Sequence, residues 1–271
     1  HVKIAARNLR MTNGTIVSTD NVSPFKPDGI TVTVSDKLTM IGPAFIVTSA
    51  FDPTSGAPVG DISLTAKDIV VTDASLISSE TFSSGPGGQL KIVADTLQLL
   101  SGGQIKSGST FAPPFGRLPQ GITPTGPGGD ITIQTLGPTG SILINGTDSG
   151  IFTNTEGTGA GGSIKLSAKT LTIQNGATIS ASTTGIDSRA TGGSIIVNAT
   201  DQVTLSNGGS ITASSVVNPE KPNTGIANAG NIAINAGQQL EMHDGSSITT
   251  ITHSPQANGG NIDIRAIDRI Q

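Results

Sequence analysis

Hydrophobic and polar residues alternate along this chain in short runs, and the runs recur in sets of three. Alternate side chains of a β-strand share one face, so each run predicts a short strand with one buried face. The runs do not follow the 3.6-residue period of an amphipathic helix. In the segment 161–182, GGSIKLSAKTLTIQNGATISAS, the apolar positions are Ile164 and Leu166, then Leu171 and Ile173, then Ile179 and Ala181.

The same unit returns at intervals of about thirty residues, which is typical of a solenoid. Close copies are GGSIIVNATDQVTLSNGGSITAS at 192–214 and GNIAINAGQQLEMHDGSSITT at 230–250, and others begin near Gly60 and Gly88. Pairs such as Asn175-Gly176 predict turns between the runs. Three short strands joined by turns describe one triangular coil of a right-handed, single-stranded parallel β-helix, whose coils stack about 4.8 Å apart.

Alignment of the copies on their first apolar residue predicts eight complete coils and the start of a ninth. We therefore expect about nine rungs in a single solenoid segment that occupies residues 1–271. The first strands should start at Val2, Ile30, Ile62, Leu90, Ile131, Ile164, Ile195, Ile232 and Ile262.

Three columns of stacked residues should fill the interior, because small and branched side chains tile a narrow core at high density. The first is a small inward corner position: Ala6, Val34, Ala66, Ala94, Ala168, Ala199, Ala236 and Ala266. The second is the apolar residue of the third strand: Ile16, Ile46, Leu76, Ile105, Ile151, Ile179, Ile211 and Ile248. The third lies two residues later and stays small: Ser18, Thr48, Ser78, Ser107, Thr153, Ala181, Ala213 and Thr250.

The coils differ in length mainly between the third strand and the next first strand. Long insertions fall at 108–128 and 214–228. Insertions at one corner form a decorated edge, which is either a tolerated surface feature or a binding edge. In the fifth coil, Ile142 follows Ile131 by eleven positions, more than in the other coils, so we expect a bulged corner there.

Both ends of the sequence fall within the repeat. A free β-solenoid needs capping segments to protect its open edges, and neither end has a polar, amphipathic one. We expect that the segment continues in a longer solenoid; end-to-end stacking of separate chains into a fibre is the alternative.

Composition agrees with a narrow aliphatic interior. Hydrophobic residues make up 34% of the chain, and there are 36 Gly, seven Phe, no Trp and no Tyr. The net charge of −4, without a basic cluster, argues against nucleic acid as a partner. The absence of Cys excludes disulfides and Cys-type metal sites. No apolar run is long enough for a membrane helix, so we expect a soluble chain whose targeting segment, if it is exported, lies outside these residues.

One pair of carboxylates merits consideration as a catalytic site. Asp61 and Asp130 occupy the same column two coils apart, and two stacking steps would separate them by about 9–10 Å. That distance is near the upper range for inverting glycoside hydrolases. We favour a turn role, because short polar residues that bond nearby backbone fill this column in other coils: Gln89, Ser163, Ser194, Asn231 and Asn261.

The remaining candidate chemistry is sparse. His1, His243 and His253 are scattered, and two histidines without a third ligand predict no metal site. The segment Gly126 to Asp130 resembles a calcium-binding nonapeptide, but the required repetition is missing. We therefore predict no catalytic residue, no metal and no cofactor.

The quoted units, above all those at 161–182, 192–214 and 230–250, resemble the repeat region of filamentous-haemagglutinin-like exoproteins. These are the large secreted partners of two-partner (type Vb) secretion systems in Gram-negative bacteria. The resemblance covers nearly the whole chain and is strongest after residue 160. It implies a right-handed parallel β-helix, export through an outer-membrane β-barrel transporter, and a place outside the cell or on its surface.

The function implied by this resemblance is a non-catalytic structural segment of an adhesin or fibre. Surfaces, glycans or other cells would then meet the edge loops at 108–128 and 214–228. Two alternatives are a self-assembling extracellular filament subunit and a polysaccharide-active enzyme on the same fold. Folding could also propagate coil by coil during export, because each coil rests on the one before it.

Overall fold

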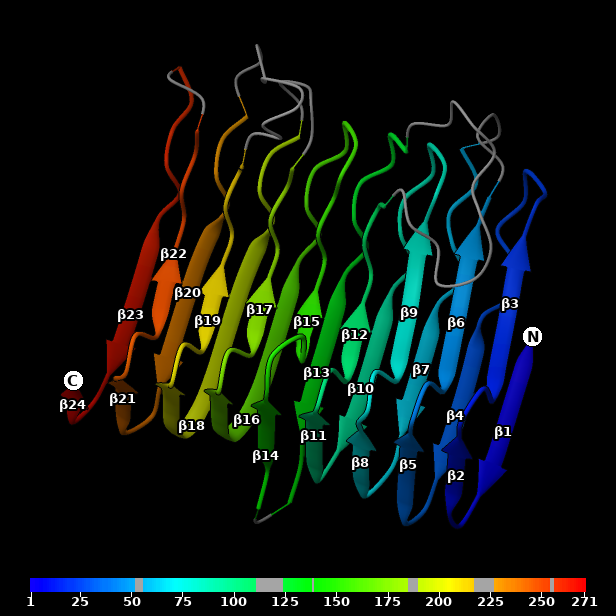
Figure 1. Ribbon diagram of the computed structural model, residues 1–271, viewed down its shortest axis with the longest axis horizontal. Coiled ribbons are helices and arrows are strands. Elements are labelled where there is room, and N and C mark those ends of the chain that lie inside the picture. The colour runs from blue at the N-terminus through cyan, green and yellow to red at the C-terminus, as the bar shows by residue number, and fades with distance from the viewer. Residues whose placement is uncertain (52–55, 111–123, 138, 185–189, 217–226, 254–255) are drawn as a thin grey trace.

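The computed structural model describes all of the chain except residues 52–55, 111–123, 138, 185–189, 217–226 and 254–255. The described residues form twenty-four β-strands that pair in parallel throughout. They contain no helix of the length and apolar character that crossing a membrane requires. Each coil passes along three walls in turn, as Figure 1 shows.

The first and second walls make up one continuous sheet of sixteen strands. The first wall consists of β1 (Val2–Ala6), β4 (Ile30–Val34), β7 (Ile62–Thr65), β10 (Leu90–Ala94), β13 (Ile131–Thr135), the first halves of β16 (Ile164–Gln174) and β18 (Ser194–Ser206), β20 (Asn231–Ala236) and β23 (Ile262–Ala266). The second wall consists of β2 (Leu9–Thr12), β5 (Lys37–Ile41), β8 (Asp68–Val71), β11 (Thr96–Leu100), β14 (Ser141–Asn145), the second halves of β16 and β18, β21 (Gln239–Met242) and β24 (Arg269–Ile270).

The third wall is a separate sheet of eight strands. It consists of β3 (Ile16–Asn21), β6 (Phe45–Ala50), β9 (Leu76–Thr81), β12 (Gln104–Lys106), β15 (Gly150–Phe152), β17 (Thr178–Ser180), β19 (Ser210–Thr212) and β22 (Ser247–Thr249). In Figure 1 this wall runs upward in front and the first wall runs downward behind, while the chain advances from right to left. The molecule is therefore a right-handed parallel β-helix, as predicted.

The predicted first-strand starts are confirmed in all nine coils. Each pairs directly with the next, from Val2 with Ile30 to Ile232 with Ile262. The corner column is confirmed as well: Ala168, Ala199, Ala236 and Ala266 stack in register. In the fifth coil Thr135 takes this place, opposite Ala94.

The predicted third-wall columns are wrong in two coils. The residues that stack with Ile46 are Val17 and Ile77, not Ile16 and Leu76. In the same way Thr19 and Ser79, not Ser18 and Ser78, stack with Thr48. A shift of one residue exchanges the two faces of a strand, so Ile16 points outward and is 50% exposed.

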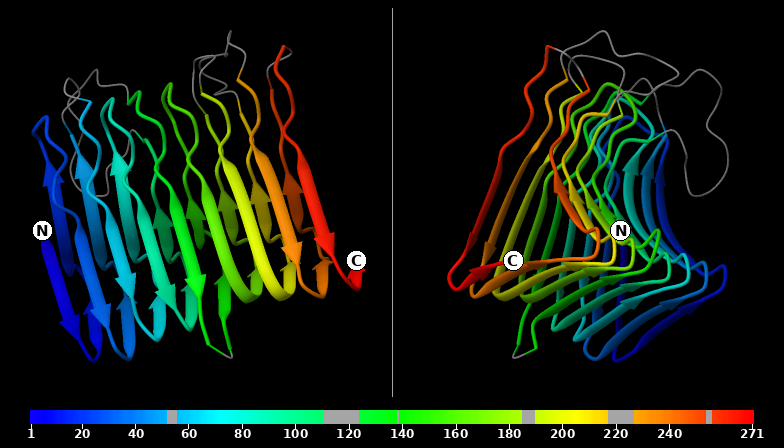
Figure 2. Two further views of the ribbon diagram at one scale, coloured as in Figure 1. Left: turned by 180° about the vertical axis from the view of Figure 1, so that it is seen from behind. Right: turned by 60° about the vertical axis from the view of Figure 1, so that its left-hand side comes forward.

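The turns between the second and third walls use left-handed backbone, which glycine and asparagine tolerate. Asn175 and Gly176 have φ of 57° and 79°. The fifth coil has the predicted bulged corner, with Gly137 and Gly140 also at positive φ. Figure 2 shows the described parts of the connections from the third wall to the first along one edge of the solenoid. Of the predicted edge loops, residues 111–123 and 217–226 lie outside the described part of the chain.

Candidate functional site

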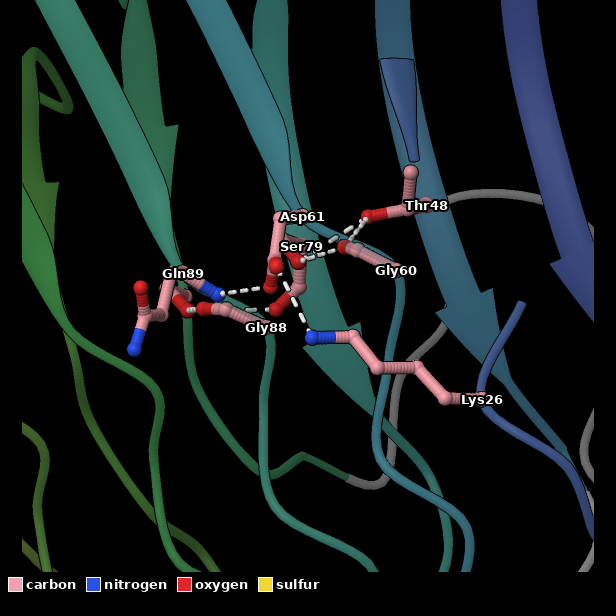
Figure 3. Close-up of polar contacts among 8 residues, drawn as sticks. Lys26, Thr48, Gly60, Asp61, Ser79, Gly88 and Gln89 are labelled. Atoms are coloured by element: carbon pink, nitrogen blue, oxygen red, sulfur yellow. Dashed lines mark hydrogen bonds and ion pairs between the residues drawn. The ribbon is translucent and has the colours of Figure 1, made fainter. Parts of the chain in front are cut away.

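The polar column after the turn glycine has a structural role, which its third-coil member illustrates in Figure 3. Asp61 accepts a hydrogen bond at Oδ1 from the backbone N–H of Gln89, at 2.9 Å. Its Oδ2 forms an ion pair with Lys26 Nζ at 2.8 Å. The carboxylate therefore ties its own coil to the next one.

Asp130 uses its carboxylate in the same way, because its Oδ1 accepts from the backbone N–H of Ser163 at 3.0 Å. Asn231 repeats this bond to Asn261 N at 2.9 Å. Asp61 and Asp130 line one shallow groove of about 220 Å³. Each is engaged by backbone, as expected of turn residues that bond the nearby chain.

Hydroxyl groups inside the corner support the same turn. Thr48 and Ser79 both donate to the carbonyl oxygen of Gly60, at 2.7 and 2.8 Å. Thr153 donates to Gly162 O at 2.9 Å and Thr250 to Gly260 O at 3.0 Å. The small column of the third wall thus satisfies backbone carbonyl groups that the corner buries.

His243 and His253 lie in the coil where the sequence places them, on either side of β22. His243 Nδ1 lies 2.7 Å from Asp244 Oδ2, and both side chains are exposed. His253 donates its backbone N–H to Ser215 O at 3.2 Å. The described residues contain no group of three or more His, Asp or Glu side chains placed to hold a metal ion.

The outward face of the third wall carries a different kind of site. Thr178 of β17 and Ser210 of β19 lie on this face, with their hydroxyl oxygens 2.9 Å apart. In the coils before β17, a cavity of about 250 Å³ opens on the same face. We call it the face cavity; it is lined by Glu80, Gln104, Lys106, Thr110, Phe152, Asn154 and Glu156.

A glycine keeps two strands close together beside this cavity. The ladder pairs Thr81 with Ser109 and Ser109 with Thr155, which places Gly108 at the register position between Glu80 and Asn154. A Cβ atom at Gly108 would lie 2.3 Å from the carbonyl oxygen of Asn154. Glycine is therefore required there by the close approach of the neighbouring backbone.

Charge is concentrated in this cavity. Glu80 is 6% exposed, and Ser78 Oγ donates to its Oε2 at 2.7 Å. Burial raises the pKa of Glu80, and the charge of Glu156 raises it further, while Lys106 and the Ser78 hydrogen bond act in the opposite direction. Lys106 Nζ lies 5.7 Å from the centre of the Phe152 ring, within range of a cation–π contact.

The sequence reasoning missed this site because of the register error in the third coil. In the predicted register Leu76 points inward, and Glu80 therefore points inward as well. Its neighbours on the outward face of the following coils are then not recognised. The useful signal was the charge itself: an unpaired carboxylate inside a narrow aliphatic core is very costly, so the register that turns Glu80 outward is favoured. Lys106 and Phe152, which pair across β12 and β15, then complete the cluster.

The arrangement can hold a small polar molecule between an aromatic ring, an ammonium group, carboxylates and amides. The Asp61 and Asp130 column, by contrast, is occupied by bonds that maintain the fold. No family model, curated protein or solved structure matches this chain, so conclusions about its function rest on its own residues and geometry.

Proposed function

We propose that the chain is a non-catalytic structural segment of a secreted or cell-surface β-helical adhesin or fibre. The observation that carries the proposal is the in-register stack of first strands, which continues through all nine coils. Such a stack makes an elongated body that can hold other parts of a protein away from a surface. The resemblance of the repeats to filamentous-haemagglutinin-like exoproteins supports the same role.

Export through an outer-membrane transporter is the second part of the proposal. A chain without Cys can pass a pore unfolded, since no disulfide locks it beforehand. Once outside, each coil can fold on the edge of the previous one, because a solenoid repeat contacts only its neighbours. Folding that propagates in this way would draw the chain outward.

The test compares two substitutions of isoleucine in the parent protein, expressed in the cell that makes it. Ile211→Asp places a charge at a fully buried position of β19, whereas Ile196→Asp changes an outward residue of β18 that is 38% exposed. We expect Ile211→Asp to stop the export of everything that follows it, and Ile196→Asp to leave export unchanged. Surface labelling and immunoblots of the culture medium measure both. Normal export of the Ile211→Asp protein contradicts the folding step, and an intracellular wild-type protein contradicts the surface role.

A further inference from the structure

The face cavity offers paired donors and acceptors around an apolar ring. Gln104 donates its Nε2 to Asp148 O at 2.7 Å, which leaves its Oε1 as the acceptor for a ligand. Asn154 is arranged the other way, since its Oδ1 accepts from Ser180 Oγ and from the backbone N–H of Ser182 at 2.7 and 2.9 Å. Its Nδ2 is then the available donor.

The two charged residues nearest the ring add one group of each kind. Lys106 supplies an ammonium donor, and Glu80 supplies a second carboxylate oxygen beyond the one that Ser78 engages. The ring of Phe152 contributes an apolar surface beside them. A ligand that suits all of these groups must both donate and accept hydrogen bonds at adjacent atoms and present an apolar face to the ring.

The charges also restrict the ligand. The carboxylate of Glu80 repels an anion, and the ammonium group of Lys106 repels a cation. A neutral ligand avoids both repulsions.

We propose that the face cavity binds a neutral sugar ring, whose vicinal hydroxyl groups bond to Glu80, Gln104, Lys106 and Asn154 while its C–H face packs on Phe152. The volume of about 250 Å³ lies below the range typical of drug-sized ligands and suits one ring. This inference goes beyond the structural role proposed above, which requires no ligand on this wall. Its failure leaves that role intact.

The probes are methyl glycosides of glucose, galactose, mannose and N-acetylglucosamine, with glucuronic acid and glucosamine as charged comparators. Saturation-transfer difference NMR on the 271-residue chain detects which of them bind, and titration gives each affinity. We expect at least one neutral glycoside to bind more tightly than both charged sugars. Absence of binding by every neutral glycoside, or tighter binding of a charged sugar, overturns the proposal.

Two pairs of variants locate the site. Phe152→Ala is matched by Phe25→Ala, because Phe25 is a phenylalanine that is 78% exposed and lies outside the cavity. Lys106→Met is matched by Lys91→Met, at an exposed lysine of β10. We expect Phe152→Ala and Lys106→Met each to weaken binding about tenfold, the loss of one favourable contact, and the matched variants to bind as the wild type does. Equal affinities within either pair place the sugar elsewhere and overturn the assignment.

Circular dichroism establishes that each variant retains its β-structure before binding is measured. If Phe152→Ala does not fold, Phe152→Leu keeps the apolar volume but removes the flat ring. Weaker binding by the folded Phe152→Leu protein then supports the ring contact, and unchanged binding contradicts it.

Discussion

One residue in the third wall illustrates how burial controls charge in this fold. Glu80 points away from the core and is nevertheless 6% exposed. Burial is the largest influence on its pKa and raises it, because a carboxylate loses solvation when water is excluded. The charge of Lys106 and the hydrogen bond from Ser78 offset part of this cost. The contribution of Glu80 to the free energy of folding therefore depends on pH.

The sign of this dependence follows from proton linkage. The raised pKa means that the folded protein binds a proton at Glu80 more readily than the unfolded chain does. The stability linked to this proton is fully present below the ordinary glutamate pKa and is lost as pH rises through the raised value. Glu80→Gln removes the titration, so we expect the variant to gain stability relative to the wild type as pH rises above the ordinary glutamate pKa of about 4.3. Urea unfolding at several pH values measures the difference.

A second variant tests the assignment of causes. Lys106→Met removes the ammonium group that lowers the pKa of Glu80. The loss of wild-type stability should then begin at the same pH but extend to a higher one. A difference between Glu80→Gln and wild type that stays constant with pH contradicts the linkage, and so does a Lys106→Met curve parallel to the wild type.

Residue identity alone did not determine which face of β3 and β9 points inward. Ile16-Val17 and Leu76-Ile77 are both pairs of adjacent aliphatic residues, and Ser18-Thr19 and Ser78-Ser79 are pairs of adjacent hydroxyl residues. Either member of each pair fits a column of aliphatic or small side chains. Where only one candidate was present, as at Ile105 or Ile179, the predicted register is the observed one.

At the level of the strand and its corners, the third wall joins the first through closely stacked glycines. A Cβ atom at Gly193 would lie 2.0 Å from the carbonyl oxygen of Gly162 in the coil below. At Gly259, in a corresponding Gly-Gly pair, the nearest atom would be Thr250 O at 3.7 Å, an ordinary contact. The glycine at 193 is therefore required by the close approach of two backbones, not by its own dihedral angles.

Two alanine substitutions separate these cases. Gly193→Ala should lower the free energy of unfolding by about 3 kcal/mol or more, because backbone must move to admit the methyl group. Gly259→Ala should change it by about 0.5 kcal/mol or less in either direction. Urea unfolding followed by circular dichroism compares the two with the wild type. Similar losses in both variants contradict the explanation by backbone contact.

Much at this scale was predictable from the sequence. Alternation located the strands, and the Gly-Gly and Asn-Gly pairs located the corners, because few other residues tolerate such close contact or left-handed backbone. The face cavity was not predictable in the same way. It depends on Glu80, Lys106 and Asn154, which are far apart in sequence and belong to three successive coils. Only a correct register across all three coils brings them together.

At the scale of the whole molecule, the core is a continuous column of aliphatic side chains that runs from coil to coil along the axis. Ile173 is fully buried and pairs with Ile144 in the preceding coil and Leu205 in the following one. Ile264, in β23, pairs with Ile234 of the preceding coil. Each coil thus depends directly on its neighbours and on distant coils only through them.

This dependence predicts a local response to a core lesion. Ile173→Ala leaves a cavity and should cost about 2–5 kcal/mol. In a solenoid that cost should appear as faster amide hydrogen exchange in β14, β16 and β18. Exchange in β4 and β5 should stay nearly unchanged, because these strands can open without disturbing the altered coil. Ile264→Ala serves as the control and should speed exchange in β20 and β23 alone. Hydrogen exchange read by mass spectrometry distinguishes these patterns. A uniform loss of protection along the chain in the Ile173→Ala protein would mean that the nine coils open as one unit. That result would contradict coil-by-coil folding and the export step proposed from it.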